Sequence, residues 1–245
     1  MSTDDDSLEL DPIFIIYSSY ANKANEDEII DALKQETRQV HLVYLQFDDD
    51  IFNQSEEIQE AILLASKKTS GLLTKVSCYN TCTNQNPQQQ LHTRCLEFFC
   101  QLLEGGRNNH NQGAGFEDIS YFDSHPLTLI DANKVAAAIA SSSNIKRLIF
   151  STRFHIGGSF ECVFNAVLDR GIKDFRVLFT STTQAELHAI DIKNLTNNTT
   201  LKTLILYDND EGNFPTGFTE QFAMHLVNIL KTNQSLEKSP FLHIC

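Results

Sequence analysis

The chain has 245 residues, a net charge of −13 and 41% hydrophobic residues. This acidity argues against a nucleic-acid or anionic-membrane partner, because phosphate groups are bound by basic surfaces. The apolar content is sufficient for one continuous core, and no segment approaches the ~18 apolar residues of a membrane span.

A short apolar pattern recurs along the chain: an apolar residue, two others, an apolar residue, one other and a third apolar residue. The copies follow one another at intervals of about 30 residues, which is typical of one strand-plus-helix unit repeated along a solenoid. They begin at Leu10, Val40, Leu73, Phe116, Ile145, Ile172, Leu201 and Leu236.

The first and last copies are the least regular. The first reads Leu10, Ile13 and Ile15, whereas the last has Ser239 in the second apolar position. Pro240 follows directly and lacks an amide donor, which suits a strand at the edge of a sheet. We therefore expect the stack to end there.

Each expected strand is followed by apolar residues at steps of three and four, which predicts a helix. Gly171 and the Asn residues near the expected helix ends suit left-handed or turn positions. The predicted helices are Glu26–Glu36, Glu56–Lys67, Leu91–Leu103, Ala132–Ser141, Phe160–Asp169, Ala185–Leu195 and Glu220–Leu230.

The longest interval between copies contains a polar, Gly-rich stretch at about 104–115. We interpret this stretch as a surface loop inserted into a single domain that spans residues 1–245. A flexible boundary between two half-arrays is the alternative. No Gly/Ser or Pro linker divides the chain elsewhere, which favours the single domain.

With these repeats, the chain resembles leucine-rich repeat proteins of the ribonuclease-inhibitor-like class. The resemblance implies an α/β solenoid, a horseshoe of about eight strand–helix units with a parallel sheet on its concave face. In that family a small polar residue lies three places after the third apolar position. The corresponding residues are Ser18, Asp48, Thr81, Ser124, Thr180 and Asn209, whereas Arg153 departs from the pattern and should interrupt it.

Successive side chains of a strand point to opposite faces of the sheet. The apolar residues of the pattern should therefore point into the core, and the residues next to them should lie on the concave face. The outward set is rich in aromatic and Arg side chains, which dominate binding hot spots. β-propensity alone is the other explanation for such residues. The candidate partner-binding residues are Tyr44, Tyr79, Phe122, Arg147, Ile149, Asp174, Arg176, Leu178, Ile205 and Tyr207.

The same alternation makes a test of strand register. Two outward residues, Ile149 and Ile205, should be exposed to solvent. Their inward neighbours should be buried, namely Leu148, Phe150, Leu204 and Leu206.

No motif indicates catalysis, a phosphate-binding loop or a metal protease. Cys78, Cys82, His92 and Cys95 can be written as a loose zinc set, but their positions among apolar residues favour core packing. The scattered histidines, His155, His188 and His225, are interpreted as surface or groove residues. We therefore expect no enzyme activity, no metal and no cofactor.

The favoured function is non-catalytic recognition of a protein partner. One alternative is regulation of a small GTPase, because repeats of this class also occur in activators of Ran-type GTPases and Arg153 is expected in a loop just past a strand. A metal-dependent enzyme is a second alternative.

The N-terminal residues 1–6 contain neither the basic nor the apolar run of a secretory signal. We therefore expect a cytoplasmic protein with reduced cysteines. The Asn- and Lys-rich composition and irregular repeats also resemble the repeat effectors that intracellular bacterial pathogens, such as Legionella, deliver into host cells. That resemblance implies a host protein as the partner and secretion into the host cytosol.

Overall fold

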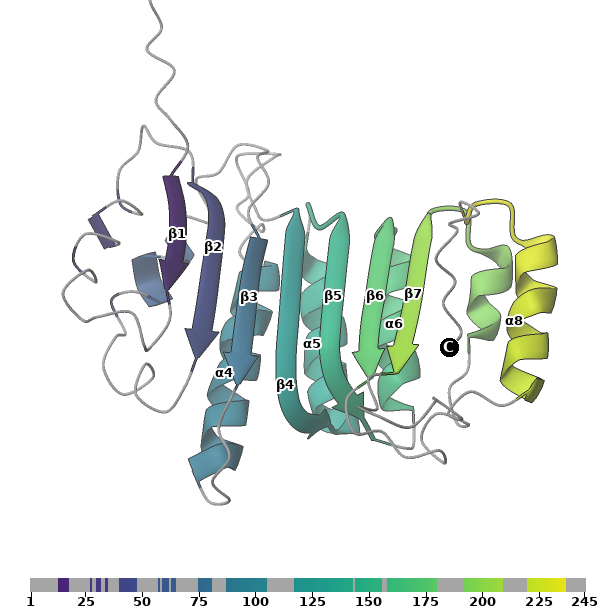
Figure 1. Cartoon of the computed structure of the whole chain (residues 1–245), viewed down its shortest axis with the longest axis horizontal. Helices are drawn as coiled ribbons and strands as arrows, with labels where there is room; N and C mark the ends of the chain where they lie inside the picture. Colours follow the sequence, from purple (N-terminus) through teal and green to yellow (C-terminus); the bar gives the residue numbers. More distant parts are fainter. Residues whose placement is uncertain are drawn as a thin grey trace, which may run out of the picture.

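The strands form one open parallel sheet in sequence order (Figure 1). The computed structural model describes residues 13–17, 27, 30–31, 34, 40–47, 57, 59–61, 63–64, 75–80, 87–104, 117–142, 144–155, 158–179, 192–208 and 220–236. The strands are β1 (Ile13–Tyr17), β2 (Val40–Phe47), β3 (Lys75–Asn80), β4 (Asp118–Leu127), β5 (Arg147–Phe154), β6 (Asp174–Phe179) and β7 (Thr203–Asp208). The expected α/β class with a parallel sheet is confirmed.

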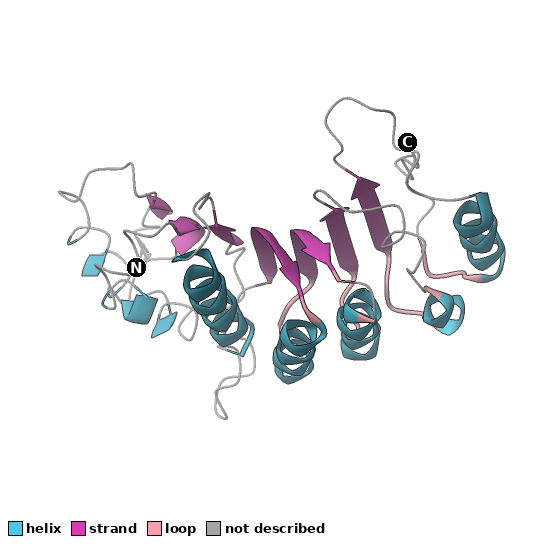
Figure 2. Cartoon of the chain, turned by 90° about the horizontal axis from the view of Figure 1, so that it is seen from below, coloured by secondary structure: helices cyan, strands magenta, loops and turns pink. Residues whose placement is uncertain are grey.

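The described helices lie along one face of this sheet, and the opposite face carries none of them (Figure 2). Parallel sheets are usually covered on both faces, so this one-sided arrangement is unusual. We call the side on which none of the described helices lies the helix-free face. The helical elements are α4 (Pro87–Glu104), α5 (Leu129–Ser141), α6 (Ser159–Arg170), the 3₁₀ helix η2 (Lys193–Asn197) and α8 (Glu220–Thr232).

In six neighbouring strands, the residues at the second apolar position of the repeated pattern pair with one another across the sheet. In addition, the carbonyls of Glu117, Lys146 and Lys173 each accept hydrogen bonds from two consecutive amides of the next unit. The same backbone contact therefore repeats at the start of β5, β6 and β7. The aligned residues are Val43, Val76, Ile119, Leu148, Phe175 and Leu204.

The first copy of the pattern is wrongly placed by two residues. Ile15, rather than Ile13, pairs with Val43, and Ile13 pairs with Val40. The pairing of β1 with β2 is irregular between Ile13 and Phe14, and the sequence pattern carried no sign of that irregularity. A shift of two leaves each side chain on the same face, so the alternation survives.

Several helix predictions agree with the structure, and the differences have local causes. Helix α5 begins at Leu129 because Thr128 and Asp131 form a reciprocal capping box at its start. Helix α4 starts four residues before the predicted Leu91. Residues 27, 30, 31 and 34, and 57, 59–61, 63 and 64, are helical within the two predicted N-terminal helices.

The ends of the units are held by turn residues. Gly171 follows α6 with φ 77°, and the amides of Gly171 and Ile172 bond Leu168 and Val167 as in a Schellman motif. Gly158 directly precedes α6 and has a φ of 93°. Asn198 and Asn233 accept amide bonds from the residues that start the next segment.

Some predictions fall outside the described residues. These include the inserted loop from residue 105 on, the strand expected after Leu236, most of the predicted helix Ala185–Leu195, and five of the small polar positions, Ser18, Asp48, Thr81, Thr180 and Asn209.

The core lies between the sheet and the helices and is built on aromatic rings. The Phe150 ring centroid lies 5.6 Å from that of Phe99, 5.9 Å from that of Tyr121 and 6.2 Å from that of Phe175. Each of these four side chains is fully buried. Edge-to-face packing of this kind adds ~0.5–1.5 kcal/mol per pair beyond the burial of apolar area.

Among the described helices, none combines the length and apolar character needed to cross a bilayer.

Candidate functional site

The predicted partner-binding residues meet as neighbours on the helix-free face. Arg147 pairs with Asp174, and Ile149, Arg176 and Ile205 form a second row across three strands. A third row runs through Tyr79, Phe122, Ser151, Leu178 and Tyr207, while Tyr44 pairs with Ser77 in the second row. Side chains are described for all ten predicted residues except Tyr44, Tyr79 and Tyr207.

The expected burial contrast is present but weaker than predicted. Ile149 and Ile205 are half-buried rather than fully exposed, since side chains of adjacent rows shield one another. Leu148, Phe150 and Leu204 are buried as expected. Leu206 is only partly buried against the core, which corrects that prediction.

Charged side chains connect three strands on this face. Arg147 donates from Nη1 to Asp118 Oδ2 and from Nε to Asp174 Oδ2, each at 2.8 Å. Arg176 donates two hydrogen bonds to the same Asp174, from Nε to Oδ1 at 2.8 Å and from Nη2 to Oδ2 at 2.7 Å. We call Asp118, Arg147, Asp174 and Arg176 the charge network.

The hydrogen bonds of the charge network favour the ionised forms. Burial alone would raise the pKa of Asp174, but the bonds from Arg176 and Arg147 outweigh it and lower that pKa below its usual value. Bonding to Asp174 in turn raises the pKa of Arg147 and of Arg176. These three groups therefore carry full charges at neutral pH.

Two polar atoms on the same face are buried without a hydrogen-bond partner among the described residues, namely Asp118 Oδ1 and Ser120 Oγ. Their residues are 5% and 0% exposed and belong to the rows of Arg147 and Ile149. Buried polar atoms are nearly always hydrogen-bonded in folded proteins. Their presence marks the β4–β5 part of the face as unusual.

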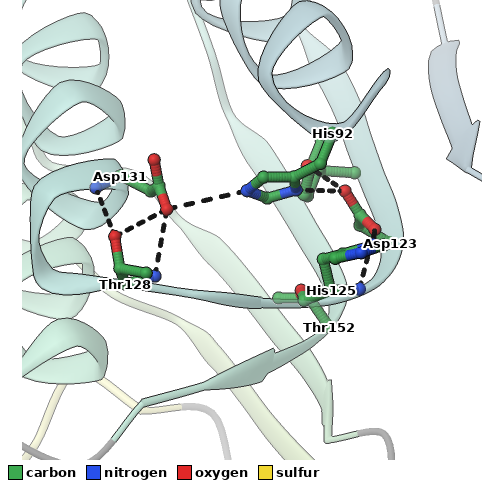
Figure 3. A network of polar contacts seen from close by, with 7 residues as sticks. His92, Asp123, His125, Thr128, Asp131 and Thr152 are labelled. Atoms are coloured by element: carbon green, nitrogen blue, oxygen red, sulfur yellow. Dashed lines mark hydrogen bonds and ion pairs between the residues drawn. The ribbon is translucent and has the colours of Figure 1, made fainter. Parts of the chain in front are cut away.

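A second polar cluster lies where β4 runs into α5 (Figure 3). His92 comes from α4, Asp123 and His125 from the end of β4, and Asp131 from the first turn of α5. The pairing of β4 with β5 is irregular between Phe122 and Pro126, so Asp123 and His125 sit in a local bulge. We call His92, Asp123, His125 and Asp131 the His–Asp cluster.

Asp123 is the centre of the His–Asp cluster and is only 3% exposed. Its Oδ2 accepts from Tyr121 Oη and from His92 Nδ1, both at 2.7 Å, and its Oδ1 accepts from the His125 amide at 2.8 Å. Burial would raise the pKa of Asp123, but these bonds lower it. For His92 the directions are reversed. Burial alone would lower its pKa, but the contacts with Asp123 and Asp131 raise it above the usual value.

Within the part of the chain that the structure describes, two imidazole nitrogens of this cluster are buried without a hydrogen-bond partner, His92 Nε2 and His125 Nδ1. His92 Nε2 lies 3.6 Å from Asp131 Oδ2, and His125 Nδ1 lies 3.4 Å from Asp123 Oδ1. The two rings are 5.4 Å apart between centroids. Chemically, such a group can hold a proton or a cation between its carboxylates.

Sequence reasoning missed the His–Asp cluster. It considered His92 only with Cys78, Cys82 and Cys95; Cys95 is indeed buried in the core, whereas His92 is buried in polar contacts. The Asp123–His125 spacing on one strand was the available signal. Its link to His92, on another element, depends on the tertiary structure.

Arg153 lies within β5 and pairs with Pro126, so it is not the loop residue past a strand that the sequence predicted. The polar turn contact of this unit comes one residue earlier, where Thr152 Oγ1 donates to the His125 carbonyl at 3.0 Å. His155 is exposed, as expected, whereas His188 and the side chain of His225 are outside the described part of the chain.

Comparisons with protein families, with curated proteins and with solved structures find no match to this chain.

Proposed function

We propose that the chain is a leucine-rich-repeat-like solenoid of about eight units that binds a protein partner, without catalysis, on its helix-free face. The carrying observation is the alignment of the predicted residues into adjacent rows there. A sheet face on which no described helix lies leaves room for a partner, and curved repeat proteins use such surfaces for binding.

The chemistry of this face favours a partner that combines apolar side chains with oxygen acceptors. Phe122, Ile149, Leu178 and Ile205 are half-buried and offer apolar contact. Arg147 and Arg176 each use only two nitrogens in the charge network. A guanidinium has five N–H donors, so each Arg keeps donors for carbonyl or carboxylate groups of a partner.

The charge network also reduces the cost of binding. Arg147 and Arg176 are held by Asp174 before any partner arrives, so less side-chain entropy is lost on association. Fixed Arg side chains next to apolar ones are a common composition of interface hot spots. We therefore expect the centre of the interface near β5 and β6.

The test begins with capture of partners by the whole chain from a lysate of host-type cells, because the composition resembles effectors that act there. A captured protein is then purified and titrated calorimetrically against the wild type and against Phe122→Ala/Arg176→Ala. We expect the double variant to lose at least about tenfold in affinity, or 1.4 kcal/mol. Circular dichroism verifies that it stays folded.

A matched control is available on α8, where Met224 and Val227 are exposed on the helix. The variant Met224→Ala/Val227→Ala removes apolar surface of comparable size away from the helix-free face. It should bind the partner unchanged. Loss of binding in this variant but not in Phe122→Ala/Arg176→Ala would assign recognition to the helices instead.

A further inference from the structure

We propose that His92, Asp123 and His125 form a zinc site that ties α4 to the end of β4. One nitrogen of each imidazole and one carboxylate oxygen of Asp123 lie within 4.8 Å of one another. Imidazole and carboxylate are common zinc ligands, and where three protein ligands hold the ion, a water molecule completes the tetrahedron. This site lies apart from the proposed partner-binding face.

The buried ring nitrogen of His125 is the independent observation that points to a ligand. His125 Nδ1 is enclosed but makes no hydrogen bond within the described structure, and it lies 3.4 Å from Asp123 Oδ1. Buried polar atoms are normally hydrogen-bonded in folded proteins. A zinc ion that replaces the proton between His92 Nδ1 and Asp123 would give this nitrogen a partner, whereas His92 Nε2 faces Asp131 on the other side of its ring.

The spacing of the ligand atoms suits a tetrahedral ion. Ligand atoms at 2.0–2.1 Å from zinc stand about 3.3 Å apart, and His125 Nδ1 lies 3.4 Å from Asp123 Oδ1. The 2.7 Å contact of His92 Nδ1 with Asp123 Oδ2 is a hydrogen bond. Zinc would replace its proton, and the pair would separate by about 0.6 Å.

The surroundings resemble the outer contacts that hold metal ligands in place. Tyr121 Oη donates to Asp123, and Thr152 Oγ1 donates to the carbonyl of His125. The carboxylate of Asp131 lies 3.6 Å from His92 and adds a second negative charge. When both imidazoles are neutral, as ligands must be, the two carboxylates carry a charge of −2 that a divalent cation offsets.

The set contains no thiolate, which separates this proposal from a cysteine site. Nitrogen and oxygen ligands together favour zinc over magnesium or calcium, which prefer oxygen alone. His92 and Asp123 are buried and His125 is partly buried, and these ligands come from α4 and β4. The ion would therefore serve as a clamp between these two elements.

The experiment uses the whole chain, stripped of metal with a chelator and dialysed. Titration with zinc chloride, followed by calorimetry, should show one site with a micromolar or tighter dissociation constant. Zinc should also raise the melting temperature, because it binds the folded state alone. Magnesium chloride at the same concentration should change neither reading. Absence of zinc binding would overturn the proposal.

Variants assign the ligands. His125→Ala should weaken zinc binding at least tenfold, and so should His92→Gln, which keeps a polar side chain if alanine disrupts the fold. His155→Ala removes an exposed histidine at the end of β5 and should bind zinc as the wild type does. Equal zinc affinity in all three variants would overturn the assignment.

Cobalt then separates this site from a cysteine site, because the chain has six cysteines. Bound cobalt should show visible bands of nitrogen and oxygen ligands without the intense near-ultraviolet absorption of thiolate. That absorption at one equivalent of cobalt would place the ion on cysteines and contradict the proposal.

Discussion

The two faces of the sheet use the same strands in different ways. Toward the helices, Tyr121, Phe150 and Phe175 are fully buried and pack ring against ring. On the helix-free face, Arg147 and Arg176 keep about two fifths of their side chains exposed and pair with Asp174. Alternation along each strand separates these sets by a single residue.

The two faces differ in how much apolar surface they bury, and the face with less apolar burial is the one proposed for recognition. Apolar burial is the dominant favourable contribution to folding, and it is concentrated on the helix side. The helix-free face instead holds pre-formed ion pairs that fix side chains in place. Mutations in neighbouring residues of one strand should therefore differ sharply in effect.

The largest effect is expected from Phe150→Ala. Phe150 is fully buried at the centre of the aromatic core, so its loss should lower the free energy of unfolding by ~3–5 kcal/mol. Ile149→Ala, on the other face of the same strand, should cost ~1 kcal/mol because Ile149 is only half-buried. Urea denaturation measures both, and equal losses would erase the distinction between the faces.

A smaller effect is expected from Asp174→Asn. Asp174 accepts three bonds from Arg147 and Arg176. The neutral amide would take away the carboxylate partner of Arg176 and leave Arg147 with Asp118 alone. We expect a loss of ~1–2 kcal/mol, which lies between exposed and buried ion pairs. Denaturation in 0.5 M salt is the check, since screening should reduce the difference between variant and wild type.

The charge network should also contribute to acid sensitivity. The pKa of Asp174 is lowered in the folded state, so its stabilisation is complete above the pKa of the unfolded chain, near 4. It is lost as pH falls through the lower folded pKa. Between pH 5 and pH 2, Asp174→Asn should therefore lose less stability than the wild type, as measured by urea midpoints. Parallel curves would contradict this expectation.

The smallest effect is expected from Lys146→Ala. The Lys146 side chain pairs with Glu117 but is 59% exposed, and exposed pairs of this kind contribute ~0–1 kcal/mol. The backbone of Lys146, by contrast, contacts both neighbouring units and is kept in the variant. A thermal melt within a degree or two of the wild type is expected. A large drop would mean that side chains, rather than backbone bonds, join the units.

The repeated pattern predicted much of the fold because each copy has the same alternation of apolar and other residues, which favours a strand with one buried face. Strand positions such as Leu148 and Phe175 were placed correctly, since period-two alternation is a local property of the chain. The N-terminal copy was misplaced because the irregularity between Ile13 and Phe14 is set by pairing with β2. The start of α5 was missed because its capping box lies before the apolar pattern.

The two candidate sites also differ in how far the sequence predicted them. Arg147, Asp174 and Arg176 could be assigned to one face from alternation, but the specific bonds depend on the strand-to-strand register. The His–Asp cluster could not be predicted, because a bulge in β4 and a helix from the preceding unit bring its members together. No sequence period encodes either feature.

The order of residues along the chain was enough to predict strands that alternate with helices, the inward and outward positions on the regular strands, and the acidic character of the chain. These follow from the order of apolar and polar residues, which act over a few positions. The tertiary structure alone decided that His92 meets Asp123 and that Arg147 bridges two aspartates on neighbouring strands. Such contacts join residues about one repeat apart, so only the stacking of the units brings them within bonding distance.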